Sequence, residues 1–381
     1  MKRLLLALVA VMTVLVGWCC TSAIVSGKLT KNGRPLMWKN RDTNDLNNRV
    51  KVIDAHDGCY RFVAVFDARD KHDTAAWMGY NERGFAIMNT ASYNINDDTI
   101  PLRAMDKEGV LMRQALERCA TVEDFDRLLD TLPRPLLVEA NFGVIDAQGG
   151  AAYFETGNYS VVRYDVADEP SGILTRTNYS YSGRLDRGNG YIRELNERHL
   201  LAPHIAARDF TPAVFTEELS RTFYHDLLGE DFTHSGREWL VDQDFIPRRI
   251  SSGSFVFEGV LPGEDPQLTT LWAALGYPPC AEVRPVWLWQ GGVPEEVVGQ
   301  GPKRHAPLAD SANVRKQDVF SVERGNGQHY LNLSKLYNPQ GTGYCQILIP
   351  KNLATYERGY KTLAQRRAAL SKKAPKKSKR R

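Results

Sequence analysis

The chain has 381 residues, of which 43% are hydrophobic and 25% charged, a composition typical of a globular protein with a large core and not of a disordered chain. Its net charge of +4 is unevenly distributed, because residues 365–381 carry nine Lys or Arg and no acid, and Lys2 and Arg3 add two more cations. Without these eleven cations residues 4–364 carry −7, so the basic balance does not indicate a nucleic-acid-binding fold.

The N-terminus has the pattern of a secretory signal peptide. A positively charged start precedes the apolar run LLLALVAVMTVLV at residues 4–16, which is too short to span a bilayer comfortably. We expect removal of residues 1–19, export to the periplasm or the extracellular space, and a mature chain that begins with Cys20. The alternatives are a short membrane anchor and a lipoprotein with its lipid on Cys20; the large Trp18 disfavours lipid on Cys19, because that processing site requires a small preceding residue.

Short strands are expected over residues 20–100. Asn32-Gly33 is the strongest short hairpin signal in the chain, and it lies between the expected strands TSAIVSGKL (21–29) and RPLMWKN (34–40). Three more strands follow: RVKVIDA (49–55), YRFVAVFD (60–67) and GFAIMNT (84–90).

A helical block and a second hairpin come next. Apolar residues recur at helical spacing over residues 108–131, and Thr121 with Asp124 is typical of a capping box between two helices. Strands then return as NFGVIDA (141–147), AAYFET (151–156) and YSVVRYD (159–165). The pair Gly149-Gly150 between the first two predicts their turn.

The rest of the chain again mixes helices and strands. A second helical block over roughly residues 188–226 is expected to break near Pro203 and Pro212. Two strands, SFVFEGV (254–260) and VRPVWLW (283–289), and a last helix at about 352–369 complete the set. Hairpins in place of regular βαβ alternation predict antiparallel sheets with helices outside them, in layers, and not a doubly wound parallel fold. We expect one domain over residues 20–364 and a basic, disordered tail over residues 365–381.

Common catalytic and metal-binding motifs are absent from the sequence. It contains no GxGxxG, GxxxxGK[ST], HExxH or GxSxG. Five cysteines remain beyond the leader: Cys20, Cys59, Cys119, Cys280 and Cys345. Because five is odd, at least one thiol stays free or pairs between chains, and none of the five has CxxC spacing. With eight scattered histidines, the pattern predicts neither a metal nor a cofactor.

A cysteine at the start of a mature chain carries its own general base. A thiol with a pKa of about 8.5 needs a base to become a nucleophile, and a free α-amine with a pKa of about 7.7–8.0 sits on the same residue. With Asn32-Gly33 as a two-residue turn, Cys20 would face Asp45, and Asp42 would lie about 10 Å along the strand. Either carboxylate could hold the amine, and the pattern alone slightly favours Asp45.

The residues around Cys20 resemble those of a known superfamily. CTSAIVSGK followed by NGRPLMWKNRD is similar to the start of the cysteine-type N-terminal nucleophile (Ntn) hydrolases, which include choloylglycine hydrolases, penicillin V acylases, acid ceramidases and acyl-CoA:6-aminopenicillanate acyltransferases. These begin Cys-Thr and continue to an Asn-x-Asp element, here Asn40-Arg41-Asp42, which moves the preference from Asp45 to Asp42. The resemblance implies an α+β, four-layer αββα sandwich of two antiparallel sheets flanked by helices. It also implies substrate contacts at Lys39, where many members have Arg, and at Arg41.

Further segments resemble the same superfamily and imply the other site residues. GYNERGFAIMNT (79–90) and ILTRTNYS (173–180) are similar to the segments that supply two oxyanion-hole asparagines, which points to Asn89 and Asn178. FIPRRISSGSFVFEGV (245–260) is similar to the segment with a late arginine near the nucleophile, for which Arg249 is the first choice and Arg248 the second. LTTLWAALGYPP (268–279) also resembles the acyltransferase-like branch, without an implied catalytic role.

These residues predict an exported amidohydrolase that cleaves a linear amide or N-acyl bond through an acyl-thioester on Cys20. The expected partner is a small-molecule amide, with no nucleic acid and with membrane contact only through the leader. Three alternatives stay open: transfer of the acyl group to an amine, dipeptide cleavage by a related Ntn cysteine peptidase, and a non-catalytic envelope lipoprotein anchored at Cys20.

Overall fold

A computed structural model of the protein describes residues 20–373, so the predicted signal peptide and the last eight residues of the basic tail lie outside the described part. Two large sheets form its centre, and every pair of neighbouring strands in them is antiparallel. The six-stranded sheet has the order β10-β1-β2-β14-β15-β16, and the seven-stranded sheet runs from β3 to β9 in chain order.

The six-stranded sheet draws its strands from distant parts of the chain. They are β1 (Thr21–Val25), β2 (Leu36–Asp42), β10 (Ile173–Arg176), β14 (Ser251–Glu258), β15 (Thr270–Leu275) and β16 (Val283–Val286). β1 follows Cys20 directly, so the expected nucleophile stands at the N-terminal end of a buried strand. In the structure, β2 is hydrogen-bonded on both edges, to β1 and to β14.

The seven-stranded sheet is a meander. Its strands are β3 (Asn48–Ile53), β4 (Phe62–Asp67), β5 (Met78–Asn81), β6 (Ala86–Ala91), β7 (Ala140–Ile145), β8 (Ala151–Thr156) and β9 (Val161–Asp165). Two small ribbons lie outside the large sheets: β11 (Tyr224–His225) with β12 (Glu230–Asp231), and β13 (Trp239–Val241) with β17 (Tyr330–Asn332).

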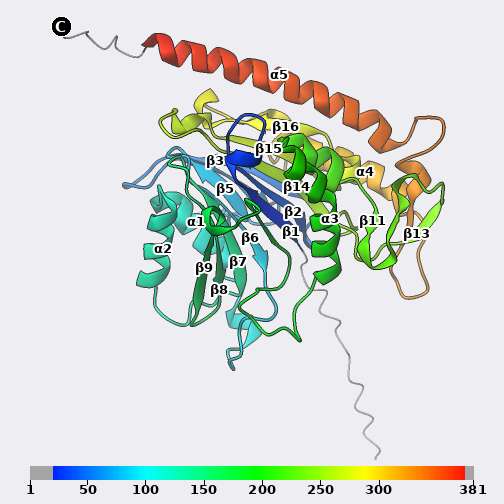
Figure 1. The fold of residues 1–381 in the computed structure, drawn as a ribbon, viewed down its shortest axis with the longest axis horizontal. Coiled ribbons are helices and arrows are strands. Elements are labelled where there is room, and N and C mark those ends of the chain that lie inside the picture. The colour runs from blue at the N-terminus through cyan, green and yellow to red at the C-terminus, as the bar shows by residue number, and fades with distance from the viewer. Residues whose placement is uncertain (1–19, 374–381) are drawn as a thin grey trace, which may run out of the picture.

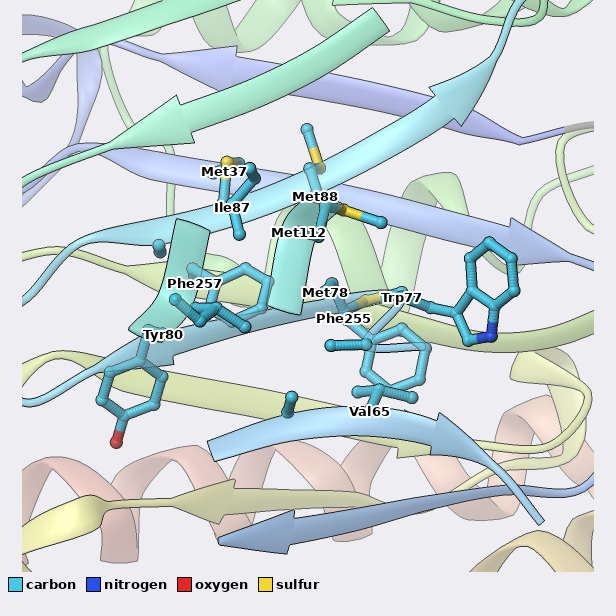
Figure 2. Packing of buried hydrophobic residues seen from close by; sticks show 14 of the residues in the cluster. Met37, Val65, Trp77, Met78, Tyr80, Ile87, Met88, Met112, Phe255 and Phe257 are labelled. Carbon is cyan, nitrogen blue, oxygen red and sulfur yellow. The ribbon is translucent and has the colours of Figure 1, made fainter. Parts of the chain in front are cut away.

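The two large sheets pack face to face around a shared apolar core. Met37, Phe255 and Phe257 from the six-stranded sheet are fully buried in the same cluster as Met78 and Tyr80 from the seven-stranded sheet. Figure 2 shows these side chains gathered between the strands, and the rings of Tyr80 and Phe257 meet edge to face at 6.4 Å. Burial of apolar side chains from both inner faces holds the sheets together.

Helices cover the outer face of each sheet (Figure 1). On the seven-stranded sheet lie α1 (Glu108–Arg118) and α2 (Val122–Thr131), and Phe125 of α2 contacts the rings of Phe142 and Phe154. On the six-stranded sheet lie α3 (Tyr191–Ala207), a π-helical segment (Val214–Leu219), α4 (Pro307–Val319) and α5 (Tyr344–Lys373). The predicted four-layer αββα sandwich of antiparallel sheets is therefore confirmed.

Several local predictions are also confirmed. The first helical block is two helices, and Thr121 and Asp124 form the complete capping box between them. The second hairpin pairs Ile145 with Ala151, with Gly149 in its turn at a φ of +98°, a conformation that favours glycine. The second helical block is interrupted near Pro212 as predicted, because α3 ends at Ala207 and the π-helical segment begins at Val214.

The predicted register of the first hairpin is wrong. Thr21 pairs with Asn40, so paired positions sum to 61 rather than 65, and Cys20 is brought opposite Arg41 instead of Asp45. The cause is a loop over residues 26–35 in place of a two-residue turn. Thr30 Oγ1 closes this loop internally by donating to the main-chain oxygens of Gly27 at 3.0 Å and Arg34 at 2.8 Å.

Three other expectations need correction. Pro203 does not break a helix but lies inside α3 near its end, where Leu201 is buried against the six-stranded sheet. The elements β5, β10, β15 and α4 and the strands of the two small ribbons were not predicted. The expected disordered tail is helical as far as Lys373, because Ala and Arg favour a helix and because Arg366 lies over the ring of Trp289 at 5.0 Å.

Within residues 20–373 no helix is both long and apolar enough to cross a membrane. All five described cysteines are free thiols.

Candidate active site

Cys20 directly precedes β1 and lies beside the C-terminal end of β2. It is almost completely buried, with 5% of the residue exposed. Its Sγ is 3.9 Å from the main-chain oxygen of Asp42. The shift of the hairpin register produces this contact, because it moves the end of β2 next to Cys20. The structure therefore brings Cys20 to Asp42 and places Asp45 beyond the strand, where its carboxylate pairs with the exposed Arg69.

Asp42 is a buried carboxylate with a complete set of donors. Its Oδ1 accepts from Ser251 Oγ at 2.6 Å and from Asn40 Nδ2 at 2.9 Å. Its Oδ2 accepts from Arg248 Nη2 at 2.5 Å and Nε at 3.2 Å. Such a side chain is rigidly oriented, because four donors, two of them from one guanidinium, fix both oxygens.

The two neighbouring arginines are placed differently. The sequence favoured Arg249 near the nucleophile, whereas the structure brings Arg248 to Asp42. Arg249 is exposed, and its main-chain N–H donates to Asp242 Oδ2 at 2.8 Å. Arg248 is held by Ser251, whose Oγ accepts from the Arg248 main-chain N–H at 2.9 Å, so one hydroxyl positions both partners of the ion pair. The geometry thus favours the second choice for this position.

Lys39 and Asn89 connect the two sheets beside Cys20. Lys39 Nζ, on β2, donates to Asn89 Oδ1, on β6, at 2.9 Å and approaches the main-chain oxygen of Trp77 at 3.5 Å. Burial lowers the pKa of Lys39 to about 8, against an opposing effect of the nearby Cys20 thiol. Asn89 Oδ1 accepts from the Lys39 ammonium, so the Asn89 side chain can donate only from Nδ2.

Asn178 is joined to Cys20 by a residue that the sequence did not indicate. Arg193, on α3, is 1% exposed and donates from Nη1 to the main-chain oxygen of Cys20 at 2.5 Å and to Thr21 Oγ1 at 2.9 Å. Its Nη2 donates to Asn178 Oδ1 at 2.9 Å, and Asn178 Nδ2 donates to the main-chain oxygen of Ala91 at 2.8 Å. One buried guanidinium therefore fixes both the Cys20 main chain and the amide of Asn178.

Arg41 is engaged inside the protein. Its Nη2 lies 3.0 Å from Asp67 Oδ1, its Nη1 donates to Asn48 Oδ1 at 2.5 Å, and its guanidinium lies over the Trp77 ring at 5.1 Å. Only 2% of the residue is exposed. These contacts tie β2 to the seven-stranded sheet and fit a supporting role better than the predicted contact with substrate.

The other buried thiols are in settings that favour the protonated form. Burial raises the pKa of Cys119 to about 12 and holds the pKa values of Cys280 and Cys345 above the usual range. A thiol that stays protonated is a poor nucleophile. Residues 20–373 also contain no group of three or more His, Cys, Asp or Glu side chains arranged to hold a metal ion.

The arrangement brings together the components of a cysteine nucleophile without a histidine. Lys39 and Asp42 come from β2 and Asn89 from β6, while Cys20 directly precedes β1 and Asn178 lies in the loop after β10. Each polar side chain among them has a defined partner. Two further residues that hold this site together, Ser251 and Arg193, were not predicted. No local signal marks them, because they are brought to the site by β14 and α3, far along the chain.

Comparisons with known proteins agree with this geometry. The sequence model of the acyl-coenzyme A:6-aminopenicillanic acid acyl-transferase family matches residues 29–239, more than half of the chain. The match includes Asp42, Asn89 and Asn178, and it ends before Arg248. No curated protein matches the chain.

Three solved structures are similar at low identity. An N-acylethanolamine-hydrolyzing acid amidase ortholog from Caenorhabditis elegans has a TM-score of 0.43 and 13% identity over 64% of this chain and 94% of its own. A variant of the conjugated bile acid hydrolase from Clostridium perfringens has a TM-score of 0.42 and 12% identity over 71% and 93%. Penicillin V acylase from Agrobacterium tumefaciens has a TM-score of 0.38 and 14% identity over 70% and 85%.

The length of the family match decides the assignment: this chain belongs to the acyl-coenzyme A:6-aminopenicillanic acid acyl-transferase family, within the Ntn-hydrolase superfamily of amidases and acyltransferases.

Proposed function

We propose that this protein is an exported amidohydrolase that cleaves a linear amide or N-acyl bond through an acyl-thioester on Cys20. The observation that carries the proposal is the convergence on Cys20 of a fixed carboxylate, Asp42, and of two asparagines held by buried cations. The proposal requires removal of residues 1–19, because only then is the nitrogen of Cys20 a free amine. It also requires export, for which the N-terminal sequence pattern is the support.

The first step is activation of the thiol. The freed α-amine of Cys20, oriented by Asp42, takes the proton from Sγ and leaves a thiolate. Arg248 and Ser251 hold Asp42 in one orientation, and in the proposed step the negative charge of its carboxylate stabilises the resulting ammonium electrostatically.

The second step is attack on the amide. The thiolate forms a bond to the carbonyl carbon, and the C=O electron pair moves to the oxygen. Asn89 Nδ2 and the second N–H of Asn178 Nδ2, whose first N–H is bonded to the Ala91 oxygen, stabilise this oxyanion. Loss of one such donor typically costs about 3–4 kcal/mol. Lys39 and Arg193 act as positioning residues, because each binds the Oδ1 of one asparagine and so directs its amide nitrogen away.

The last steps release the products. The C–N bond breaks, the leaving amine takes the proton from the Cys20 ammonium, and an acyl-thioester remains. A water molecule, deprotonated by the same α-amine, then attacks the thioester, and the carboxylic acid leaves as the thiol is restored. If a second amine takes the place of water, the same site performs acyl transfer, the activity for which the matched family is named.

A substrate panel tests the proposal. Mature protein is incubated with N-acyl amino acids, bile-acid conjugates, penicillin V and short peptides, and amine release is followed by mass spectrometry. We expect release from at least one linear amide and none by Cys20→Ala. Release that persists in Cys20→Ala would overturn the nucleophile, and turnover of dipeptides alone would support the peptidase alternative instead.

A further inference from the structure

A pocket of about 710 Å³ lies beside the candidate active site. Its walls come from the segment after β2, from α4 and its flanking loops, and from Arg249 just before β14. We call it the basic pocket after its charged lining residues: Arg249, Lys303, His305, Lys316, His329 and one acid, Asp310. Asp310 is already paired, with its Oδ1 3.0 Å from His305 Nδ1. The exposed Arg249 and Lys303 and the buried Lys316 therefore line a space with one acid.

Lys316 is the residue that sets this pocket apart from an ordinary charged surface. It is 6% exposed, it lines the pocket, and its Nζ has no hydrogen-bond partner among the described residues. Its described contact is with the ring of Tyr277, 5.9 Å from the ammonium. A buried ammonium without an acceptor is costly, so a protein that retains one either neutralises it or presents it to an anionic ligand.

The surrounding charges point to a ligand that carries negative charge. The pKa of Lys316 is lowered to about 8, first because burial disfavours the charged form and second because the Arg249 guanidinium is a like charge nearby. The Arg249 guanidinium makes no hydrogen bond or ion pair within residues 20–373. The acids nearest to Lys316, Asp242 and Asp42, make no ion pair with it, and Asp242 accepts from the Arg249 main chain.

The basic pocket adjoins the nucleophile through two chain segments. Arg248 is bonded to Asp42, and the next residue, Arg249, lines the pocket. The strand that carries Asp42 continues directly into Leu46 and Asn47 on the pocket wall. A ligand group in the pocket would therefore lie on the Asp42 side of Cys20. Apolar wall residues, Val314 and Phe320, leave room for a short hydrocarbon part of the same ligand.

We propose that the basic pocket binds an oxyanion group of the substrate, a carboxylate or a phosphate, through Arg249 and Lys303 on its wall and through Lys316, whose ammonium lies buried beneath the wall and is uncovered when the anion enters. The pocket would then select amides whose amine portion or acyl-accepting partner is anionic. That this ligand is a substrate rests on the proposed function; that the pocket binds an oxyanion does not.

Direct binding tests the pocket without catalysis. In mature Cys20→Ala protein, calorimetry compares N-acetylglycine, inorganic phosphate and the neutral N-acetylglycinamide. We expect one of the two anions to bind about tenfold or more tightly than the neutral amide, and Lys316→Met to weaken that binding about tenfold or more, because a hydrogen bond to a charged group is lost. Preference for N-acetylglycine identifies a carboxylate site, and preference for phosphate identifies a phosphate site.

Control variants keep the binding test decisive. Arg249→Gln and Lys303→Gln replace exposed cations, so they remain usable if Lys316→Met does not fold. Lys361→Gln, an exposed residue of α5 outside the pocket, should bind as the parent does. If neither anion binds more tightly than the neutral amide, or if all three pocket variants bind as the parent does, the proposal is overturned.

Kinetics test whether the anion is part of the substrate. With Cys20 intact, Arg249→Gln should raise KM for an N-acylglycine about tenfold while KM for the matching N-acylglycinamide changes much less. An equal change for both substrates contradicts the substrate role. If no amide is hydrolysed while anions still bind, the proposed function fails and the pocket stands, so the two failures can be told apart.

Discussion

The candidate active site and the basic pocket differ in whether their charged side chains have hydrogen-bond partners. At Cys20 the buried charges of Asp42, Lys39 and Arg193 are each held by hydrogen bonds to neighbouring groups. In the basic pocket the buried Lys316 ammonium has no hydrogen-bond partner within the described residues. The exposed Arg249 guanidinium has no ion pair within them. Charged side chains that are hydrogen-bonded to one another hold a fixed geometry, which a reaction needs. A cation without a protein partner can instead form an ion pair with an anionic ligand.

Removal of the Cys20 thiol should have the largest effect on activity. We expect Cys20→Ala to lower kcat by about four to six orders of magnitude, because the nucleophile and its covalent intermediate are lost while the hydrogen-bonded frame remains. The rate of amine release measures this. Unchanged thermal unfolding of the variant serves as the control for folding.

Neutralising the fixed carboxylate should have the second largest effect. Asp42→Asn removes the group that orients the Cys20 amine, so we expect kcat to fall by about two to four orders of magnitude. The variant should also lose about 3 kcal/mol of unfolding free energy, because Arg248 is left as a largely buried cation without its partner. Denaturant unfolding and steady-state kinetics check the two parts. Wild-type kcat in this variant would contradict the role of Asp42.

The adjacent arginines allow the two regions to be compared directly. Arg248→Gln should lower kcat about 10- to 100-fold, since a charge-assisted contact to Asp42 is lost. Arg249→Gln should act mainly on KM of anionic substrates, because that side chain faces the basic pocket. Kinetic constants for both variants on one anionic amide give the answer. The reverse assignment, with kcat lost only in Arg249→Gln, would restore the choice that the sequence favoured.

The two buried lysines should give the smallest effect, seen as a dependence of stability on pH. The pKa of each is lowered to about 8 in the folded protein, against about 10.4 when unfolded. Between these values the unfolded chain binds more protons, so each lysine makes stability rise with pH, by up to about 1.4 kcal/mol per unit.

Lys39→Met and Lys316→Met should each flatten this rise between about pH 8 and pH 10. At pH 7 they should differ, because Lys39→Met leaves Asn89 Oδ1 without its donor, whereas Lys316→Met removes a cation that had no acceptor. Denaturant unfolding from pH 7 to pH 10 checks both. A slope equal to that of the wild type in either variant would contradict the lowered pKa of that lysine.

The fold followed from the sequence wherever a pattern was local. Periodicity gave the two helices over residues 108–131, and Thr121 with Asp124 marked their junction. The order of hairpins and helical blocks, together with the resemblance, led to the αββα sandwich. The register of β1 with β2 was missed because Asn32-Gly33 sits in a longer loop, closed by Thr30, that no short turn signal describes.

The candidate site was predictable in part for the same reason. Cys20, Asp42, Asn89 and Asn178 belong to recognisable segments, and the structure brings them together. The choice between two neighbouring arginines depends on which way each side chain leaves the turn before β14. Arg193 and the basic pocket depend on how α3 and α4 pack against the sheets, and that is set by tertiary contacts alone.

One experiment detects both the free amine of Cys20 and its sulfur as the nucleophile. Mature protein recovered from cells is treated with an activated acyl donor, digested and analysed by mass spectrometry. We expect an N-terminal peptide that begins with Cys20, carries the acyl group on its sulfur and has an unmodified α-amine. A lipid adduct on Cys20, or an acyl label that persists in the Cys20→Ala protein, would contradict it.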